Sequence, residues 1–540
     1  MITFDIDAQK GRQFKELYEA GLPSTVYALL CETAAKHPSA PAWHFIDEGL
    51  ERTWHDVLGL VDKTADAFHS IGIHQGSHVA IMTNNIEEFP LTWFALAKLG
   101  AVFVPVNNGY TSDEIAYALR TADSDYFILE AEFVGRYEAS AQKAVSDKNV
   151  VVIGGDTSSM YTDWAELIGG AHPPCTAGNV SPDTLLNIQF TSGTTGFSKG
   201  CLLTHEYWLV LGVTSCTIFG QTMQRIYVGQ SFYYMVSQRI FMNALLYGAC
   251  LIVPRKAGAK RFMQDVIDYE CDYCSMFEMV YKHALSLSNK ENKLKLVTIF
   301  AFGPENQRDF QSKFNVLAQE FYGMTEIGGA LYVPVDQIPN IDASGSCGVA
   351  TPFRELMICD ESGEPVAEGH IGELCVRGPG IMLGYYKNPA ANEAVFRHGW
   401  FRTGDLFRRD EHGFYRIVGR TKDMVRRNGE NIAAQEVESV IRALPEVKQV
   451  AVIPVPDDYC GEEVKAYIQL NDGVSREALP IERIVEHCRS GLARFKVPRY
   501  YEYKDNFELT DSLRVKKKAL VEEKTDLRAG SFDLKESIWR

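Results

Sequence analysis

The first part of the chain alternates between helical and strand-like patterns, and this alternation constrains the fold more than any other feature. A helical pattern runs from Trp54 to Ser70, and apolar strand-like runs follow at His78 to Met82 and at Val102 to Val106. Strands separated by helices favour parallel sheets with helices on both faces. We therefore expect an α/β fold.

The pattern changes in the second part of the chain. Between Gly345 and Gly419, short strands are separated by Gly, Pro and Asp turns, which predicts an antiparallel sheet or barrel. After Gly419, a charged segment leads to a helical pattern at 434–444 and a strand pattern at 447–453. Because 540 residues are too many for one hydrophobic core, we expect a small second domain to begin here.

The composition excludes several functions. Hydrophobic residues make up 46% of the chain and charged residues 23%, as in ordinary globular proteins. The net charge of -16 argues against a broad basic surface for nucleic acid. No apolar run reaches the roughly 18 residues needed to cross a bilayer, and the first residues do not resemble a secretory signal. We expect a cytoplasmic protein without integral membrane association.

The 12 cysteines are scattered among apolar neighbours, which favours reduced, buried thiols over a disulfide framework. Cys271 and Cys274 form a CxxC pattern with no second pair nearby. We therefore favour a core strand over a zinc site for these two residues.

The most informative segment is FTSGTTGFSKG, from Phe190 to Gly200. It follows an apolar strand-like run and precedes a helical pattern. Its hydroxyl groups, its glycine N–H groups and Lys199 are the donors and the positive charge that a polyphosphate requires. Because Gly200 follows Lys199 in place of Ser or Thr, the spacing is not that of a P-loop kinase. We predict a nucleotide-phosphate loop, with a polar surface turn as the alternative.

From about Thr53 to Leu520, the sequence resembles the adenylate-forming superfamily of acyl-CoA synthetases, aryl-CoA ligases, peptide-synthetase adenylation domains and luciferases. The segments YGMTE, FRTGD and GRTKD follow the loop in the family's order, and GYYKNP and KDMVRRNGENIAAQEVE are most similar to crotonobetaine, carnitine and aromatic-acid CoA ligases. The resemblance implies an N-terminal domain, residues 1–420, with two doubly wound sheets and a β-barrel-like subdomain. A small mobile α+β domain would occupy residues 421–540.

The same resemblance implies which residues contact the substrates. Thr325 and Lys199 would contact phosphate, Glu326 would help to hold Mg²⁺, and Asp405 would accept hydrogen bonds from the ribose. Lys422 would be the hinge between the domains. The remaining residues assigned to the nucleotide or to CoA are Thr191, Ser192, Gly193, Thr194, Thr195, Gly196, Gly303, Tyr322, Arg420 and Gly429. Taken alone, the Thr-Gly-Asp segment is a turn, and the charges near Lys422 are a solvated linker.

Two segments depart from the family. Its C-terminal catalytic lysine falls in LTDSLRVKKKAL, where Arg514 takes that position, or Lys516 if the register shifts by two residues. A basic surface strand is the alternative for both. In SFYYMVSQRIF, Tyr233 and Tyr234 stand where many ligases carry histidine, and we expect their rings to close the pocket over the acid. Arg239 in this segment is a candidate partner for a second polar or anionic group of the acid, with an exposed helical arginine as the alternative.

The sequence thus predicts an ATP-dependent acyl-CoA ligase that uses Mg²⁺. It would convert a small carboxylic acid to acyl-AMP and pyrophosphate, and then to acyl-CoA and AMP. The alternatives are transfer of the acyl group to a carrier protein, oxygen-dependent luciferase chemistry, and a degenerate nucleotide-binding protein without activity. The acid, the pathway and the oligomeric state, a homodimer included, stay open.

Overall fold

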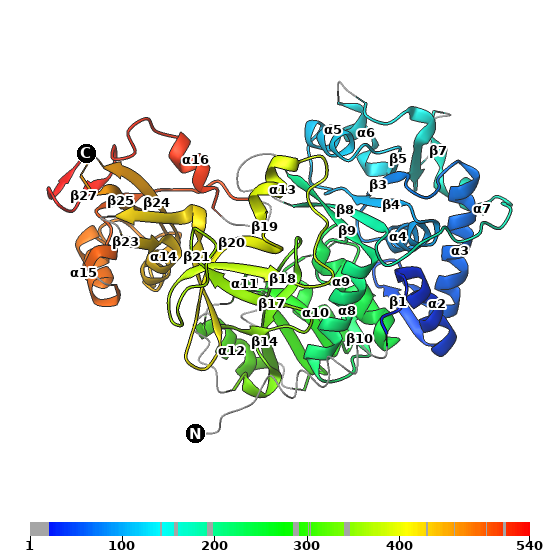
Figure 1. Cartoon of the computed structure of the whole chain (residues 1–540), viewed down its shortest axis with the longest axis horizontal. Coiled ribbons are helices and arrows are strands. Elements are labelled where there is room, and N and C mark those ends of the chain that lie inside the picture. The colour runs from blue at the N-terminus through cyan, green and yellow to red at the C-terminus, as the bar shows by residue number, and fades with distance from the viewer. Residues whose placement is uncertain are drawn as a thin grey trace. The chain divides into compact units, whose positions relative to one another are not determined.

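The computed structural model describes residues 21–140, 143–155, 160–191, 198–256, 258–283, 291–300, 302, 304–339, 346–427, 430–457, 459–492, 494–510 and 515–540. These residues form two compact units (Figure 1). The first unit comprises the chain up to Thr191, Lys199–Leu356 and Val376–Phe401, and the second comprises Met357–Cys375 and Arg402–Arg540. The expected domain boundary between residues 420 and 421 stays a prediction.

The first unit contains a seven-stranded sheet in the order β7-β6-β5-β3-β4-β8-β9. Its pairs are parallel except β8 with β9. The strands are β3 (His78–Met82), β4 (Val102–Pro105), β5 (Tyr126–Glu130), β6 (Val150–Ile153), β7 (Thr162–Asp163), β8 (Leu185–Thr191) and β9 (Lys199–Thr204). The accompanying helices are α3 (Trp54–Ser70), α4 (Glu88–Leu99), α5 (Ser112–Thr121), α6 (Val134–Glu138) and α7 (Trp164–Gly169). The predicted helix at 54–70 and strand at 78–82 are confirmed, and the strand predicted at 102–106 ends one residue earlier.

The second sheet of the first unit runs β16-β15-β14-β13-β12-β10-β11-β1-β2, and it is parallel from β14 to β1. The strands are β1 (Pro41–Phe45), β2 (Leu50–Thr53), β10 (Arg225–Tyr227), β11 (Cys250–Val253), β12 (Tyr273–Phe277), β13 (Leu296–Phe300), β14 (Leu317–Met324), β15 (Gly328–Tyr332) and β16 (Ser346–Ala350). The helices include α2 (Val26–Lys36), α8 (His205–Phe219), α9 (Met235–Tyr247), α10 (Phe262–Asp268) and α12 (Pro304–Phe314). The predicted α/β class is confirmed.

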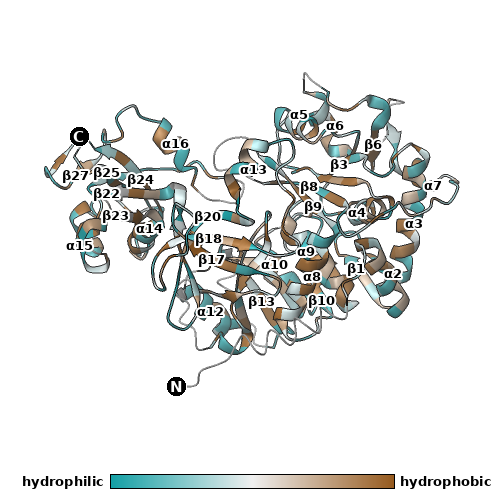
Figure 2. Ribbon diagram, in the orientation of Figure 1, coloured by the Kyte–Doolittle hydropathy of each residue, from teal (hydrophilic) through white to brown (hydrophobic). Residues whose placement is uncertain are grey.

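Helices α8 and α9 are largely buried, and Figure 2 shows hydrophobic residues along α8. Among the described helices, none combines the length and the apolar character needed to span a bilayer. Cys274 lies on β12 and Cys271 lies two residues before the strand, and both are fully buried, as the core interpretation of the CxxC pattern predicts.

The expected barrel is not closed. Strands β17 (Glu355–Cys359), β18 (Gly372–Arg377), β20 (Trp400–Arg409) and β21 (Tyr415–Arg420) are neighbours in that order. A barrel requires both edges of the sheet to be paired. Within the described chain, β17 is an edge strand that pairs with β18 alone, so of the two predicted alternatives the short strands form an open sheet.

The C-terminal part of the second unit has its own sheet, in the order β23-β22-β25-β26-β27-β28, with β24 paired to β25. Its strands are β22 (Met424–Arg427), β23 (Glu430–Ala433), β24 (Val447–Asp457), β25 (Gly461–Leu470), β26 (Tyr500–Tyr503), β27 (Phe532–Asp533) and β28 (Ile538–Trp539). Alternate residues of β24 enter two cores: Val450 and Val452 pack with α14 (Ala434–Arg442) and α15 (Ile481–Gly491), whereas Ala451 and Ile453 pack with Leu520 of α16 (Lys517–Glu522). The small α+β domain is confirmed.

The buried His205 at the start of α8 makes the stability of the first unit depend on pH. Its Nδ1 accepts a hydrogen bond from the backbone N–H of Val26 at 3.1 Å. Burial lowers the pKa of His205 from 6.5 to about 4. Below pH 6.5 the unfolded chain therefore binds a proton that the folded chain takes up only near pH 4, so the folded state loses stability as the pH falls through this window.

We expect His205 to account for a decrease of about 3 kcal/mol in the free energy of unfolding between pH 6.5 and pH 4. His205→Asn keeps an acceptor and cannot titrate, so its urea-unfolding free energy should depend less on pH than that of the wild type. His412→Asn, at an exposed position, is the matched control. Identical pH profiles for all three proteins would contradict the assignment.

Candidate active site

The two ends of the predicted phosphate loop face each other across an antiparallel pair of strands. Thr191 ends β8, Lys199 begins β9, and these two residues are partners in the register. The loop is therefore followed by a strand, and the helix expected after it begins only at His205. The sequence interpretation missed β9 because its apolar run, from Cys201 to Leu203, is too short to distinguish a strand from the start of the next helix.

Lys199 and Glu326 meet at the ring of Tyr385. The ammonium group of Lys199 lies 4.0 Å from the centroid of that ring. The Tyr385 hydroxyl donates to Oε1 of Glu326 at 2.8 Å, and the Glu326 residue is 6% exposed. Burial, together with the Glu326 carboxylate, raises the pKa of Tyr385 well above its usual range. The cluster thus brings together a cation, a neutral hydroxyl donor and a carboxylate.

The turn that carries Thr325 and Glu326 connects β14 to β15. Gly323 and Gly329 are partners across this hairpin, and a Cβ atom on Gly323 would lie 2.2 Å from the carbonyl oxygen of Gly328. The glycine of YGMTE is therefore required for the close approach of the two strands. Tyr322 lies on β14 and is half-buried, as is Thr325.

Asp405 and Arg420 form an ion pair in the second unit. They are register partners on β20 and β21, and Nε of Arg420 lies 2.9 Å from Oδ1 of Asp405. The residue Asp405 is 4% exposed. Two residues that the resemblance assigned separately to the nucleotide are therefore adjacent in the structure.

Glu373 on β18 supports the backbone of β20 just before Asp405. Its Oε1 accepts from the backbone N–H of Gly404 at 2.8 Å, and its Oε2 accepts from Nε of Arg402 at 2.7 Å. Gly404 has a φ of +72°, a conformation that favours glycine. Thr403 adds a hydrogen bond from its hydroxyl to the carbonyl of Leu374 at 2.8 Å. Glu373 therefore fixes the backbone from which the Asp405 side chain projects.

We expect Glu373→Leu to raise the KM for ATP by about 10-fold, because it removes two charge-assisted hydrogen bonds beneath the proposed ribose site. The KM for the acid should change much less. Steady-state kinetics of AMP release, with each substrate varied in turn, measures both constants. Glu355→Leu is the matched control, since Glu355 pairs with Arg377 on the exposed surface. Equal increases in both KM values would point to general destabilisation instead.

An amide network joins β8 to the segment that carries Tyr233 and Tyr234. Oδ1 of Asn187 accepts from the indole N–H groups of Trp93 and Trp208, at 2.9 and 3.0 Å, and its Nδ2 donates to Gln238 at 2.9 Å. Further along β8, Gln189 donates to the carbonyl of Tyr233 at 2.6 Å. The strand that leads into the phosphate loop and the loop before α9 are thus held together.

Tyr233, Tyr234 and Arg239 occupy different environments. Tyr233 is half-buried and Tyr234 is 37% exposed, with their ring centroids 4.4 Å apart. Arg239 on α9 is 1% exposed, so the exposed helical arginine that the sequence left as an alternative is excluded. Whether these three side chains contact substrate stays a prediction.

Several predicted residues lie outside the described part of the chain: Ser192, Gly193, Thr194, Thr195, Gly196, Gly303, Gly429 and Arg514. Lys422 lies in a 3₁₀ turn, Thr421–Asp423. Lys516 pairs with Glu508 at 2.6 Å, and its side chain is 45% exposed. The hinge role of Lys422 and the catalytic role of Arg514 or Lys516 therefore stay predictions.

Sequence reasoning missed Tyr385 and Glu373. Tyr385 lies in GYYKNP, a segment that signalled the family but pointed to no contact, because Glu326 is 59 positions away. Glu373 belongs to a short strand in a stretch that indicated only turns and strands. Both residues act through contacts between elements distant in sequence, which no local pattern reveals.

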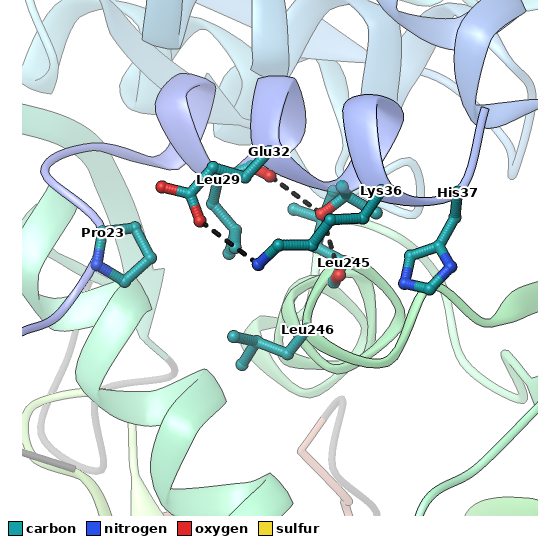
Figure 3. Close-up of a pocket in the computed structure, with 8 residues that line it drawn as sticks. Pro23, Leu29, Glu32, Lys36, His37, Leu245 and Leu246 are labelled. Atoms are coloured by element: carbon teal, nitrogen blue, oxygen red, sulfur yellow. Dashed lines mark hydrogen bonds and ion pairs between the residues drawn. The ribbon is translucent and has the colours of Figure 1, made fainter. Parts of the chain in front are cut away.

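A small pocket lies elsewhere in the first unit, between α2 and α9 (Figure 3). Its lining includes Leu29, Leu245 and the ion-paired Glu32 and Lys36. Thr33 closes one side through its hydroxyl, which donates to the carbonyl oxygens of Leu29 and Leu245. None of the predicted site residues lines this pocket, so we do not connect it with the chemistry.

The sequence matches two family descriptions: "AMP-binding enzyme" over residues 30–386 and "AMP-binding enzyme C-terminal domain" over residues 436–513. The crotonobetaine/carnitine–CoA ligase of Escherichia fergusonii is 30% identical over 483 residues, which cover 85% of this chain and 91% of that protein. The ligase of the same name from Proteus mirabilis is 31% identical over 482 residues, with the same coverage of each chain.

Solved structures agree with the fold. ATP-bound MatB from Rhodopseudomonas palustris has a TM-score of 0.81 and 25% identity, and the match covers 92% of this chain and 98% of MatB. The anthranilate CoA ligase AuaEII in complex with anthranoyl-AMP has a TM-score of 0.83 and 23% identity, with coverage of 94% and 98%. With both family matches and the curated relatives spanning most of its length, this chain belongs to the AMP-binding enzyme family of acyl-CoA ligases.

Proposed function

We propose that the protein is an ATP-dependent acyl-CoA ligase acting on a small carboxylic acid through an acyl-adenylate. The observation that supports this most strongly is the cluster of Lys199, Tyr385 and Glu326 at the end of the β8–β9 hairpin. It unites two segments, the phosphate loop and YGMTE, that both point to ATP. Family membership supports the same reaction.

In the first half-reaction, the acid's carboxylate attacks the α-phosphorus of ATP and pyrophosphate leaves. A carboxylate is a poor electrophile, so the acid is first joined to AMP, which is a leaving group that a thiol can displace. Lys199 and Thr325 would stabilise the negative charge on the phosphate oxygens, because an ammonium group and a hydroxyl group are donors to anionic oxygen. Asp405 would accept hydrogen bonds from the ribose hydroxyls and so fix the α-phosphate relative to the acid.

The donor chemistry at Glu326 fits Mg²⁺. A buried carboxylate oriented by the Tyr385 hydroxyl is a hard oxygen ligand of the type that this cation prefers. We propose that Glu326 holds the ion together with phosphate oxygens. When bound, the ion would offset negative charge on the phosphates.

In the second half-reaction, the thiol of CoA attacks the acyl carbonyl and AMP leaves. Gly429 would line the path of the pantetheine chain, where the absence of a side chain permits close approach to the backbone. Lys422 would be the hinge about which the C-terminal domain turns between the two half-reactions. Arg514, or Lys516 in the shifted register, would supply the C-terminal cation for the first half-reaction only.

The test is incubation of the purified protein with ATP, Mg²⁺ and a panel of aryl, dicarboxylic, short aliphatic and betaine acids, with and without CoA. We expect acid-dependent AMP and an acyl-CoA by mass spectrometry. Adenylate without thioester would favour a carrier protein as the acceptor. ATP binding without acid-dependent pyrophosphate release would overturn the proposal in favour of a protein that binds nucleotide without catalysing a reaction.

A further inference from the structure

Arg239 is a buried cation without a carboxylate partner among the described residues. It is 1% exposed and donates to three hydroxyl groups: Ser215 on α8 at 3.3 Å, Tyr273 on β12 at 3.3 Å and Ser275 on β12 at 3.0 Å. No described Asp or Glu lies within ion-pair distance of its guanidinium group. These hydroxyl groups accept three hydrogen bonds from the guanidinium group but provide no negative charge to balance its positive charge.

Two buried amides with unused hydrogen-bonding capacity lie on α9 and β14, the elements that carry Arg239 and Phe321. Asn243 lies one turn after Arg239 on α9, hence on the same helix face, and it is fully buried with neither Nδ2 nor Oδ1 hydrogen-bonded in the described structure. Gln319 on β14 is also fully buried, and its Oε1 has no described partner. Phe321 follows on the same face of β14, and its ring centroid lies 5.4 Å from Cζ of Arg239.

Burying the Arg239 cation and these unpaired amide groups costs folding free energy unless a ligand binds to them. A buried ion loses its hydration, and buried amide groups without hydrogen bonds lose theirs as well. One anionic oxygen would neutralise the guanidinium charge and accept a hydrogen bond from Nδ2 of Asn243, which offsets the cost of the buried ion and of that one unpaired donor. The cluster therefore has the chemistry of an anion site.

A row of aromatic rings extends from the partly exposed Phe277 to Phe321 beside Arg239. Phe277 is 42% exposed, its centroid lies 5.1 Å from that of Phe300, and Phe300 lies 6.3 Å from Phe321. Phe277 and Phe300 are register partners at the carboxyl ends of β12 and β13, and β14, which carries Phe321, is the next strand. In open parallel sheets, ligands bind at this end of the strands.

We propose that Arg239 and Asn243 form a subsite for a second carboxylate on the acid substrate. The substrate class is then a dicarboxylic acid whose apolar body lies along Phe277, Phe300 and Phe321. One carboxylate is activated, and the other binds the buried cation. This inference rests on the proposed ligase function and specifies its substrate.

The test compares acids that differ only in the second carboxylate: glutarate with pentanoate, and terephthalate with 4-methylbenzoate. We expect the wild type to favour the dicarboxylate of at least one pair by 10-fold or more in kcat/KM, because a subsite built to pair with a polar group rejects its apolar analogue. Arg239→Met should lower kcat/KM for that dicarboxylate by about 100-fold and for its monocarboxylate partner by less than about 5-fold.

Three further variants separate recognition from folding. Arg239→Lys keeps the charge and should restore part of the preference, while Asn243→Leu should reduce it by about 10-fold. Arg397→Met, which removes an exposed arginine, should leave the preference unchanged. If circular dichroism shows that Arg239→Met does not fold, the test uses the ratio of kcat/KM for the dicarboxylate to that for the monocarboxylate in Arg239→Lys and Asn243→Leu. Wild-type ratios in both variants would overturn the subsite.

The outcomes also distinguish the subsite from the ligase function itself. Equal losses for both acids of a pair would assign Arg239 a purely structural role and overturn the subsite. A wild type that turns over monocarboxylates at least as well as dicarboxylates would overturn it too, while leaving the ligase function intact. If no acid yields AMP, the ligase proposal fails and the subsite fails with it.

Discussion

Replacing Arg514 with alanine is expected to reduce acid-dependent exchange of pyrophosphate into ATP by about 100-fold or more. The resemblance implies a C-terminal cation that bridges acid and phosphate during adenylation, and it predicts Arg514, or Lys516 in the shifted register, at that position. Loss of one preorganised donor to developing negative charge typically costs about 3 to 4 kcal/mol in the transition state. The second half-reaction, measured with a synthetic acyl-adenylate and CoA, should change by less than about 5-fold.

Lys516→Ala is the matched control for Arg514→Ala. The Lys516 side chain is partly exposed and already paired with Glu508, so its loss should leave pyrophosphate exchange within about 3-fold of the wild type. A reversed pattern, with a large loss for Lys516→Ala and none for Arg514→Ala, would assign the catalytic role to Lys516 through the shifted register. Full exchange in both variants would remove this segment from the catalytic site.

Arg514→Lys tests whether the pocket is shaped for a guanidinium group. Arginine presents a planar fork, whereas lysine presents a compact ammonium group on a flexible stem. If the pocket has adapted to arginine, the lysine variant should recover only part of the exchange rate. Recovery beyond the wild-type rate would mean that Arg514 slows the native enzyme.

Local patterns in the sequence predicted some elements of the first unit accurately. The helix at Trp54–Ser70 has a Thr53 capping box and an apolar stripe, and the strand at His78–Met82 is a short apolar run between turns. These signals are complete within one element. The strand predicted at 447–453 is β24. It begins at Val447 as predicted but extends to Asp457, because its residues pair with β25 up to that point.

The contacts that organise the candidate site could not be predicted in the same way. Glu326 meets Tyr385, and Glu373 meets Gly404, through pairings that depend on the complete fold. Burial of Arg239 was equally hidden, because an arginine in a helix is usually at the surface. The described hydrogen-bond partners of Arg239 are hydroxyl groups and not carboxylates, and this follows only from the packing of α8, α9 and β12 around it.

Arg354 shows how such a long-range contact supports the site. It is 8% exposed, and burial lowers its pKa to about 10, so it remains a cation at neutral pH. Its guanidinium group donates to four backbone carbonyls: Ile327 at 2.6 Å, Phe353 at 3.0 Å, Pro379 at 2.6 Å and Gly380 at 3.2 Å. The first of these follows Glu326 directly, and the backbone N–H of Met382 donates to the carbonyl of Glu326 itself at 2.9 Å.

Arg354→Leu is therefore expected to destabilise the protein by about 3 kcal/mol or more, because it leaves four buried carbonyls without their donor. Each unpaired group costs about 1 to 3 kcal/mol. Relaxation of the backbone, and the removal of a charge that was costly to bury, offset part of this sum. Urea unfolding at pH 7 measures the loss. Arg377→Leu, at a partly exposed arginine paired with Glu355, should change stability by less than about 1 kcal/mol. In the fraction of Arg354→Leu that stays folded, the affinity for ATP with Mg²⁺ should fall more than the affinity for ATP alone, because the displaced turn carries Glu326. Unchanged stability together with unchanged magnesium dependence would show that the turn that carries Glu326 keeps its position without Arg354.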